Sequence, residues 1–468
     1  MRTTHRHKSG EQMLLKVRGD GLRRRLSHML VALVAGAATL LALRTDSAEA
    51  QGLPLIRDSE IERLLNDYSR PIFRAAGLGG GRIRIRIVRS SVFNAFVLDG
   101  RNIFVHTGAL LQSETPNQII GVLAHEAGHI DGGHMAALRA RIKQDQSRLL
   151  LVRLLGIGAA IATGNPAAMV AGDQLVLRSL LAERRSQEGA ADQAGLRYLE
   201  ATQQSGLGML QTFERFAQQE FVSARYQDPF ARSHPVAANR LANLKRLVQS
   251  SPYYKKRDSR ELQLRHDLMR AKLAGYLQSP GEVFNRYPTS DKSLPARYAR
   301  AIALFFRGGN GGLPRALAAV DSLIKSRPDY PYFWELKGDL LMRAGRKREA
   351  TPHLRRALKL APKSPLITAR LASAMLESND PKTIARSVKM LRQSLVADPS
   401  PRAYRFLANA YYKQGKRPEA DASIAQATFL QGNVKRAKVF AKRARAALRR
   451  GSPLWVKMDD IINYGAGR

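Results

Sequence analysis

Residues 115–131 read TPNQIIGVLAHEAGHID, a stretch that begins with helix-starting residues and ends with two histidines four positions apart. Thr115 can cap a helix, Pro116 suits its first position, and Gln118 stands where the partner in a capping box is found. Apolar residues then recur at helical spacing. We therefore predict a helix that runs from residue 116 beyond His129 and carries the functional site.

The end of this helix, His125-Glu126-Ala127-Gly128-His129, matches the pattern H-E-x-x-H. The two histidines lie one turn apart on one face, so both imidazoles can reach one ion. Glu126 lies about 100° around the axis, where it can take a proton from a water beside the ion. Zinc lowers the pKa of such a water towards about 7 and polarises a carbonyl. The pattern predicts a zinc-dependent hydrolase with Glu126 as catalytic base.

A tetrahedral zinc ion needs a further protein ligand beyond two histidines. The first segment to consider is residues 184–192, in which Glu188 and Asp192 stand one helical turn apart. Glu188 can supply the third ligand, and Asp192 can accept the outer N–H of a ligating histidine. The other interpretation of this pair is a solvated helix face.

The segments before the helix predict a helix and a small sheet. Residues 58–75 carry apolar side chains at helical spacing, and residues 82–87 alternate between arginine and isoleucine, as a half-buried strand does. Residues 92–98 and 103–105 flank Asp99-Gly100, a turn dipeptide typical of a hairpin. We expect these strands to form a small sheet with one open edge, near residues 94–98, along which a substrate segment can add as a strand.

Residues 149–181 are mostly apolar and are interrupted at Gly164-Asn165-Pro166. Each half is too short to span a bilayer. Three interpretations stay open: a buried or partly exposed helical hairpin, a flap over the active site, and a peripheral contact with a membrane surface.

Helical repeats are expected beyond residue 295. Pro328, Pro362 and Pro399 follow similar blocks at intervals of 34 and 37 residues. This period resembles that of tetratricopeptide repeats, whose stacked helices form a concave groove that holds peptides. A plain helical bundle is the alternative. The resemblance implies a protein or peptide partner or substrate in the groove.

Composition restricts the chemistry and the location. The chain has no cysteine, which excludes disulfides, thiol catalysis and iron–sulfur clusters. Lysine and arginine number 77 against 38 acidic residues, for a formal net charge of +39. Such an excess favours an anionic partner, such as nucleic acid, a membrane surface or an acidic polypeptide, or else reflects a compositional bias.

Residues 1–50 have the pattern of a secretory signal: a basic start, an uncharged stretch over 29–43 and Ala48-Glu49-Ala50 before Gln51. An uncleaved anchor is the alternative, and the arginines at 23–25 leave open whether export uses the general or the twin-arginine route. We expect an exported, periplasmic protein, with a possible attachment to the membrane, that has no nucleic acid as its ligand.

The ordered motifs over about residues 58–248 resemble the M48 family of zinc metallopeptidases. The resemblance rests on the histidine pair followed by Glu188 and Asp192, and on residues 94–96, 103–110, 134, 233–235 and 240. It implies His125, His129 and Glu188 as ligands of one zinc ion, Glu126 as base, and Asp192 as the residue behind a ligand. His106 departs from the family pattern and has no assigned role.

Two downstream residues have open roles. His234 precedes a proline, which favours an extended backbone. It can stabilise an oxyanion, act as a reversible fourth ligand that keeps the enzyme latent, or be a packing or surface histidine. Arg240 can bind a substrate carbonyl or pair with an acid.

We therefore expect a mainly α fold with a small β-sheet, in which a gluzincin-type metallopeptidase domain precedes an α-helical repeat solenoid. The expected division is a signal at 1–50, the peptidase at 51–250, a helical linker at 251–294 and repeats at 295–468. This combination is similar to periplasmic M48 proteins that pair protease and chaperone-like activity on outer-membrane proteins. We expect an endopeptidase for unfolded or misassembled envelope proteins. The alternative is a repeat-based chaperone or assembly scaffold with a latent zinc domain.

Overall fold

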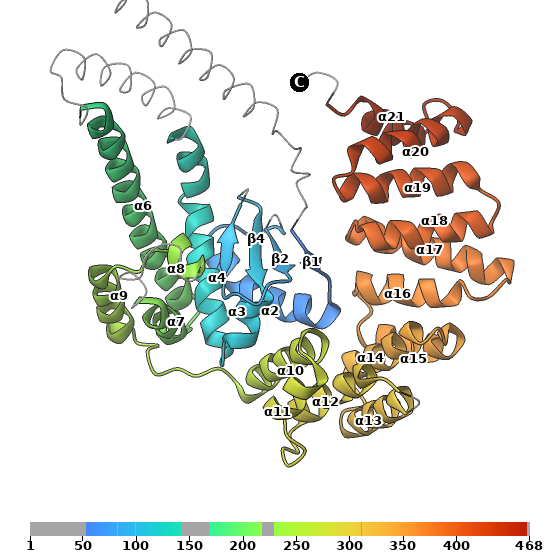
Figure 1. Ribbon diagram of the computed structural model, residues 1–468, viewed down its shortest axis with the longest axis horizontal. Helices are drawn as coiled ribbons and strands as arrows, with labels where there is room; N and C mark the ends of the chain where they lie inside the picture. Colours follow the sequence, from blue (N-terminus) through green and yellow to red (C-terminus); the bar gives the residue numbers. More distant parts are fainter. Residues whose placement is uncertain are drawn as a thin grey trace, which may run out of the picture. The chain divides into compact units, whose positions relative to one another are not determined.

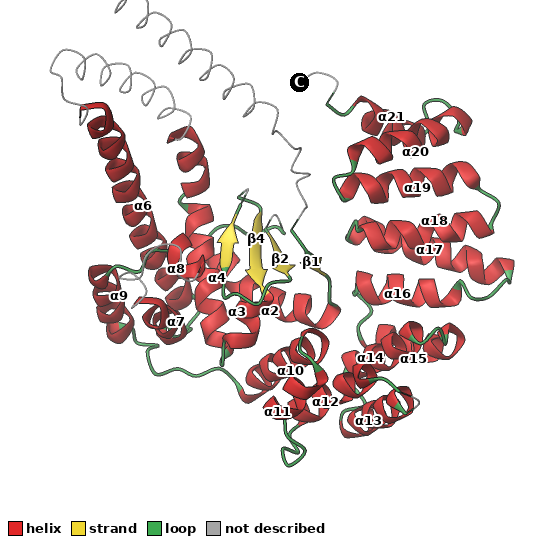
Figure 2. Cartoon of the chain, viewed as in Figure 1, coloured by secondary structure: helices red, strands yellow, loops and turns green. Residues whose placement is uncertain are grey.

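The computed structural model of the chain describes residues 53–81, 83–98, 100–141, 168–217, 229–309 and 311–465 (Figures 1 and 2). The predicted signal at 1–50 and most of the apolar stretch 149–181 lie outside these residues. The chain from Pro54 to Arg468 forms one compact unit. Among the described residues, no helix is both long and apolar enough to cross a bilayer.

A four-stranded sheet lies near the start of the described chain. Its order is β1-β2-β4-β3, with β1 at Leu55–Ile56, β2 at Arg84–Val88, β3 at Ala95–Val97 and β4 at Asn102–His106. β3 and β4 pair antiparallel, which confirms the predicted hairpin, whereas β2 and β4 pair parallel. The short strand β3 stands at one edge of the sheet, as the sequence led us to expect.

Two predicted helices of this region are confirmed as α2, Ser59–Ala75, and α4, Pro116–Asp131. Asp58 caps α2, because its side chain accepts hydrogen bonds from the backbone N–H groups of Glu60 and Ile61. The capping box predicted for α4 is wrong. Thr115 occupies the N-cap position without a side-chain hydrogen bond, because the backbone N–H of Gln118 donates to the Thr115 carbonyl, at 3.3 Å. The Gln118 side chain accepts from the backbone N–H of Glu114, at 2.7 Å, and not from that of Thr115.

The helix α6, Ala168–Ala201, packs against α4 at unusually close range. A Cβ atom on Gly128 would lie 2.7 Å from the backbone oxygen of Ala191, so only glycine permits this approach. Ala191 lies between the two acidic residues predicted for the site. The contact therefore sets the distance between those acids and the histidines of α4.

Shorter helices complete the surroundings of the site: α3 at Thr107–Gln112, α7 at Leu207–Ala217, α8 at Pro229–Ser233 and α9 at Ala238–Ser250. One continuous apolar core runs from Ile61 in α2 through the sheet, α4 and α7 to Leu273. Both faces of α4 are covered by this core. The helix that carries the histidines is consequently a fixed part of the domain.

The remainder of the chain is helical and repetitive, and Figure 1 shows its later helices in sequence from yellow to red. The helices are α10 at Arg260–Leu277, α11 at Pro280–Arg286, α12 at Leu294–Arg307, α13 at Gly312–Ser326, α14 at Pro331–Arg343, α15 at Lys347–Leu360, α16 at Pro365–Met375, α17 at Pro381–Ala397, α18 at Pro401–Lys413, α19 at Arg417–Leu430, α20 at Val434–Ala447 and α21 at Pro453–Asn463. Consecutive helices from α12 onward contact one another. This arrangement confirms the predicted fold class, a mainly α chain with a small sheet.

Candidate metal centre

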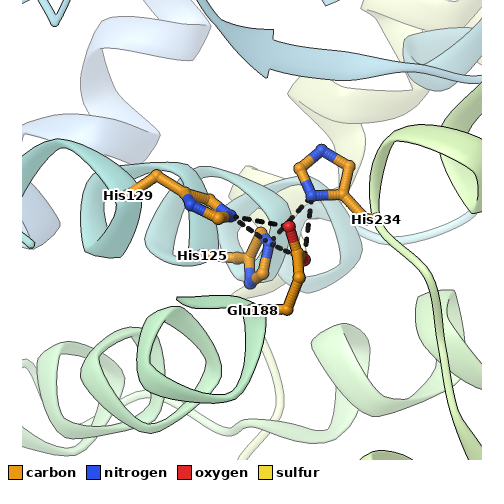
Figure 3. A group of neighbouring side chains, drawn as sticks. All are labelled: His125, His129, Glu188 and His234. Carbon is orange, nitrogen blue, oxygen red and sulfur yellow. Dashed lines mark hydrogen bonds and ion pairs between the residues drawn. The ribbon is translucent and has the colours of Figure 1, made fainter. Parts of the chain in front are cut away.

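The helix α4 places both histidines of the motif inside the protein. His125 is fully buried and His129 is 8% exposed, and their Nε2 atoms lie 3.0 Å apart. Figure 3 shows the two rings projecting from the same helix towards a common point. The spacing of four residues thus places both imidazoles on one face of the helix, as the sequence predicts.

Glu188 of α6 reaches the same point from the opposite helix. Its Oε2 lies 3.3 Å from Nε2 of His125, and its Oε1 lies 3.4 Å from Nε2 of His129. The carboxylate is 3% exposed. The structure therefore brings Glu188 to two histidines that lie about 60 positions earlier in the chain.

His234 is a fourth member of this group, since it is buried and not a surface residue. Its Nδ1 lies 3.2 Å from Nε2 of His125 and 3.1 Å from Oε2 of Glu188. Its Nε2 lies 3.2 Å from the carbonyl oxygen of Ala95 in the edge strand β3. A proton on Nε2 donates to that carbonyl and leaves the lone pair of Nδ1 facing the other three side chains.

The four side chains fit a zinc ion. One potential ligand atom from each of His125, His129, Glu188 and His234 lies within 4.8 Å of all the others. Zinc–nitrogen and zinc–oxygen bonds of about 2.0–2.1 Å in a tetrahedron imply ligand–ligand separations of about 3.3–3.4 Å. The observed separations of 3.0–3.4 Å between neighbouring ligand atoms agree with that spacing. Imidazole nitrogens and a carboxylate are also a donor set that zinc accepts.

Glu126 lies at the edge of this group without joining it. Its carboxylate is 1% exposed, and neither oxygen has a hydrogen-bond partner among the residues that the structure describes. The atom of the group that approaches it is Nε2 of His234, at 3.4 Å from Oε1. A buried carboxylate of this kind is costly unless a water or a cation accompanies it. The position suits a base that acts on a water beside the metal.

Asp192 and Arg240 contact the ligand group on the side away from its centre. Nδ1 of His125 lies 2.8 Å from Oδ1 of Asp192, which orients the ring so that Nε2 faces the group. Arg240 donates to both oxygens of Asp192, at 2.5 and 2.7 Å, and its Nη1 lies 3.2 Å from Oε2 of Glu188. Of the two roles left open for Arg240, the structure shows the pairing with acids.

The charges of the site are strongly coupled. Burial by itself would lower the pKa of His125, but hydrogen bonds and negative charge from Asp192 and Glu188 outweigh it and raise that pKa to about 9. Burial would raise the pKa of Glu188, but the charge of His234 and hydrogen bonds from the histidines hold it well below its usual value. For His129, burial dominates and lowers the pKa. The protonation of the histidines is therefore coupled to the buried carboxylates of the site.

Some neighbours of the site were not singled out by the sequence. His134 places its Nδ1 2.9 Å from the outer nitrogen of His129, although its sequence position suggested only a family match. Phe213 of α7 packs edge-on against the His125 ring and lies under the Arg240 guanidinium. No sequence pattern identified Phe213, because it is one apolar residue among many. His106 packs edge-on against Phe96 in the sheet.

Comparison with known families agrees with this geometry. The model of Peptidase family M48 matches residues 56–248, and a model of the tetratricopeptide repeat matches residues 298–365. Both resemblances inferred from the sequence are thereby confirmed.

Three similar proteins match most of this chain. A protein of Yersinia pestis named beta-barrel assembly-enhancing protease is 24% identical over 423 residues, which cover 88% of this chain and 84% of that protein. The protein of the same name from Escherichia coli (strain K12) is 21% identical over 426 residues, with the same coverage of both chains. A Vibrio cholerae protein named putative beta-barrel assembly-enhancing protease is 21% identical over 421 residues, covering 88% of this chain and 85% of that protein.

Proposed function

We propose that this chain, whose residues 56–248 form a domain of peptidase family M48, is a zinc-dependent endopeptidase that cleaves unfolded or misassembled proteins of the cell envelope. The observation that carries the proposal is the convergence of His125, His129 and Glu188 on one point, with the Glu126 carboxylate, which has no hydrogen-bond partner among the described residues, beside it. The names of the similar proteins support a role in β-barrel assembly.

In this proposal His125, His129 and Glu188 hold one zinc ion per chain. When bound, zinc supplies a Lewis acid that polarises the scissile carbonyl and makes a nearby water more acidic. Glu126 accepts a proton from that water and later gives it to the leaving amine nitrogen. Asp192 keeps the His125 ring oriented throughout, and Arg240 holds Asp192 in place.

The edge strand β3 supports a way to position the substrate. An extended peptide that pairs with Ala95–Val97 would lie across the site as an added strand. Since Nε2 of His234 lies 3.2 Å from the carbonyl of Ala95, this histidine stands where such a peptide would pass. Its Nδ1 meanwhile faces the ligand group. We therefore assign His234 the role of a reversible fourth ligand that keeps the enzyme latent until substrate displaces it.

The location and the domain division belong to the same proposal. Residues 1–50 serve as an export signal to the periplasm, 51–250 as the peptidase, 251–294 as a helical linker and 295–468 as repeats that bind protein partners. Residues 149–181 form a helical hairpin that serves as a flap or as a peripheral contact with the membrane surface in this proposal. The basic and apolar pattern at the start of the chain supports export.

The direct test is the variant Glu126→Gln, which keeps the size of the side chain but removes the base. Unfolded casein or a misfolded porin is incubated with wild type and variant, with and without a chelator. We expect the variant to bind zinc as wild type does and to lose cleavage by a factor of about 100 or more. Cleavage by the variant at the wild-type rate would contradict the assignment of Glu126.

The second candidate is a repeat-based chaperone or scaffold in which the zinc domain does not cleave. The observation that favours it is the position of His234, which would be a fourth protein ligand beside His125, His129 and Glu188 and would compete with a substrate for the metal. Suppression of porin aggregation by Glu126→Gln, with no chelator-sensitive cleavage by wild type under any condition, would establish this candidate.

A further inference from the structure

A recessed basic groove lies in the repeats, formed by the first helices of three successive helix pairs, α14, α16 and α18, together with the start of α15 and the loop after α16. It encloses a cavity of about 610 Å³. Its lining includes a single acidic residue, Glu377, and six basic residues: Arg343, Lys347, Arg348, Arg370, Arg402 and Lys413. We call this feature the repeat groove.

The helix α18 presents its groove residues as one stripe. Arg402, Phe406, Asn409 and Lys413 all line the cavity and recur at intervals of four, three and four residues. This spacing places them on one face of the helix, one turn after another. The stripe therefore offers two cations, an amide and an aromatic ring along about three turns of helix.

The positive charge of the groove is only partly balanced from within the protein. Buried Asp339 pairs with both Arg343 and Arg370, and Glu377 lies 3.0 Å from Nζ of Lys347. Arg402 is exposed and pairs with no carboxylate among the residues that the structure describes. Its pKa is lowered, first by burial of part of the side chain and then by repulsion from Arg370 and Arg343. A negative charge beside Arg402 would relieve this repulsion.

We infer that the repeat groove binds an acidic peptide segment, whose Asp or Glu carboxylates or terminal carboxylate pair with Arg402, Lys413 and Arg348. Guanidinium groups bind carboxylates in a forked geometry, and Asn409 carries an amide that can pair with peptide N–H and C=O groups. Phe406 offers an apolar contact for a neighbouring side chain. The groove thus selects its partner by negative charge within an extended chain.

The shape of the groove favours a peptide over other anions of biological size. Its charges line a cavity of about 610 Å³ between helices and not a flat face, so a partner must reach into it with a narrow segment. Stacked helical repeats commonly hold extended segments in such a concave surface. The inference concerns a binding site apart from the metal centre and does not depend on Glu126 or on zinc.

The test measures binding of two fluorescein-labelled twelve-residue peptides to the full chain by anisotropy, in the presence of chelator so that the probes are not cut. One peptide is rich in Asp and Glu, and the other has Asn and Gln in their place. The groove variant is Arg402→Glu with Lys413→Glu. The matched control is Arg386→Glu with Lys389→Glu, which makes the same change of charge at exposed positions of α17 outside the groove.

We expect the acidic peptide to bind at least about tenfold more tightly than the neutral one, with an advantage that shrinks at high salt. The groove variant should bind it about tenfold or more weakly, and the control within about twofold of wild type. A milder variant, Arg402→Gln with Lys413→Gln, should lie between the two. Equal thermal melting curves for all variants establish that the loss is local.

Three results would overturn the inference. One is equal affinity for the acidic and the neutral peptide. Another is an equal loss in the control variant, because binding would then follow overall charge. The third is the absence of peptide binding together with groove-dependent binding of anionic phosphatidylglycerol vesicles or of duplex DNA, which would assign the groove to another class of partner.

Discussion

At the scale of single residues, the proposed latency depends on His234. Its contacts connect two members of the ligand group, His125 and Glu188, to the carbonyl of Ala95 in the edge strand β3. A fourth metal ligand would slow peptide cleavage, because the substrate must first displace it. An oxyanion stabiliser would accelerate cleavage, typically by a factor of about 100–1,000.

The variant His234→Ala separates these roles. We expect it to keep zinc and to cleave unfolded casein several times faster than wild type, because the site opens. The rate of chelator-sensitive cleavage measures this. A fall of about 100-fold with zinc retained would show that His234 stabilises the transition state and would remove the proposed latency.

His266 gives a residue-scale prediction about stability and pH. It is fully buried, with Nδ1 3.0 Å from the Tyr68 hydroxyl and Nε2 3.0 Å from the carbonyl oxygen of Ser113. Burial lowers its pKa from 6.5 to about 4. Between these values only the unfolded chain takes up a proton on this residue, so the free energy of unfolding falls as the pH falls from 6.5 to 4.

The protonation of unfolded His266 lowers the free energy of unfolding by about 3 kcal/mol at pH 4. The variant His266→Gln lacks this effect, because glutamine takes up no proton. The difference in unfolding free energy between wild type and variant should therefore shrink by about 3 kcal/mol from pH 7 to pH 4. Urea denaturation at several pH values measures it. A difference that stays constant with pH would show that His266 is not buried as a neutral ring.

At the scale of elements, the sequence identified the helices and the hairpin but not their mutual distances. Local patterns suffice for α2, α4 and the β3–β4 hairpin. The parallel pairing of β2 with β4 joins segments across an intervening strand, and no local pattern encodes it. The capping box of α4 failed for a different and local reason, since the Gln118 side chain bonds the backbone N–H of Glu114 in place of that of Thr115.

For the metal centre, too, the sequence predicted the local features but not the distance between the elements. The two histidines needed only the period of a helix, whereas the reach of Glu188 depends on how closely α6 approaches α4. That distance is set by Gly128 against Ala191, a contact that appears only after folding. The roles left open for Arg240 also required the structure, because many acids in the sequence could have paired with it.

Gly128→Ala tests this helix contact. The new methyl group would collide with the backbone of Ala191, so α6 must shift, at a cost of about 1–3 kcal/mol, and carry Glu188 away from the histidines. We expect weaker zinc binding and lower activity. The matched control is Gly189→Ala on α6, where an added Cβ meets no atom within 4 Å. The account of the contact is wrong if both variants bind zinc equally well.

At the scale of the whole molecule, a buried polar junction joins the start of α2 to the helices that lead into the repeats. Nζ of Lys272 lies 2.7 Å from Asp58 and 3.2 Å from Glu60. The hydroxyls of Tyr298 and Tyr330 donate to the two oxygens of Glu60, at 2.8 and 2.6 Å. The start of α2 is therefore joined to α10, to α12 and to the residue before α14 by buried polar groups, whereas the apolar cluster around α2 and α4 and that of the first repeat helices are separate.

Removal of the cation should expose how much stability depends on this junction. Lys272→Met leaves two carboxylates without their partner in a buried site, which costs about 3–5 kcal/mol. We expect a clearly lower urea midpoint, whereas Lys255→Met, at an exposed position, should leave it nearly unchanged. Equal midpoints for the two variants would contradict the role assigned to Lys272.

The basic character of the whole chain, a formal net charge of +39, could not be assigned to a partner from composition alone. The fold gathers six of these cations, from residues 343–413, around one groove. Composition indicates the sign of the charge, and only the packing of four helices, α14, α15, α16 and α18, shows where it is concentrated.

The account depends most on a single divalent cation held by His125, His129 and Glu188. Zinc content of the purified full chain, measured by elemental analysis for wild type, Glu126→Gln and Glu188→Gln, tests this directly. We predict one zinc per chain for wild type and Glu126→Gln, and well below half of that for Glu188→Gln after dialysis. Full zinc content in Glu188→Gln, or none in wild type, would contradict the account.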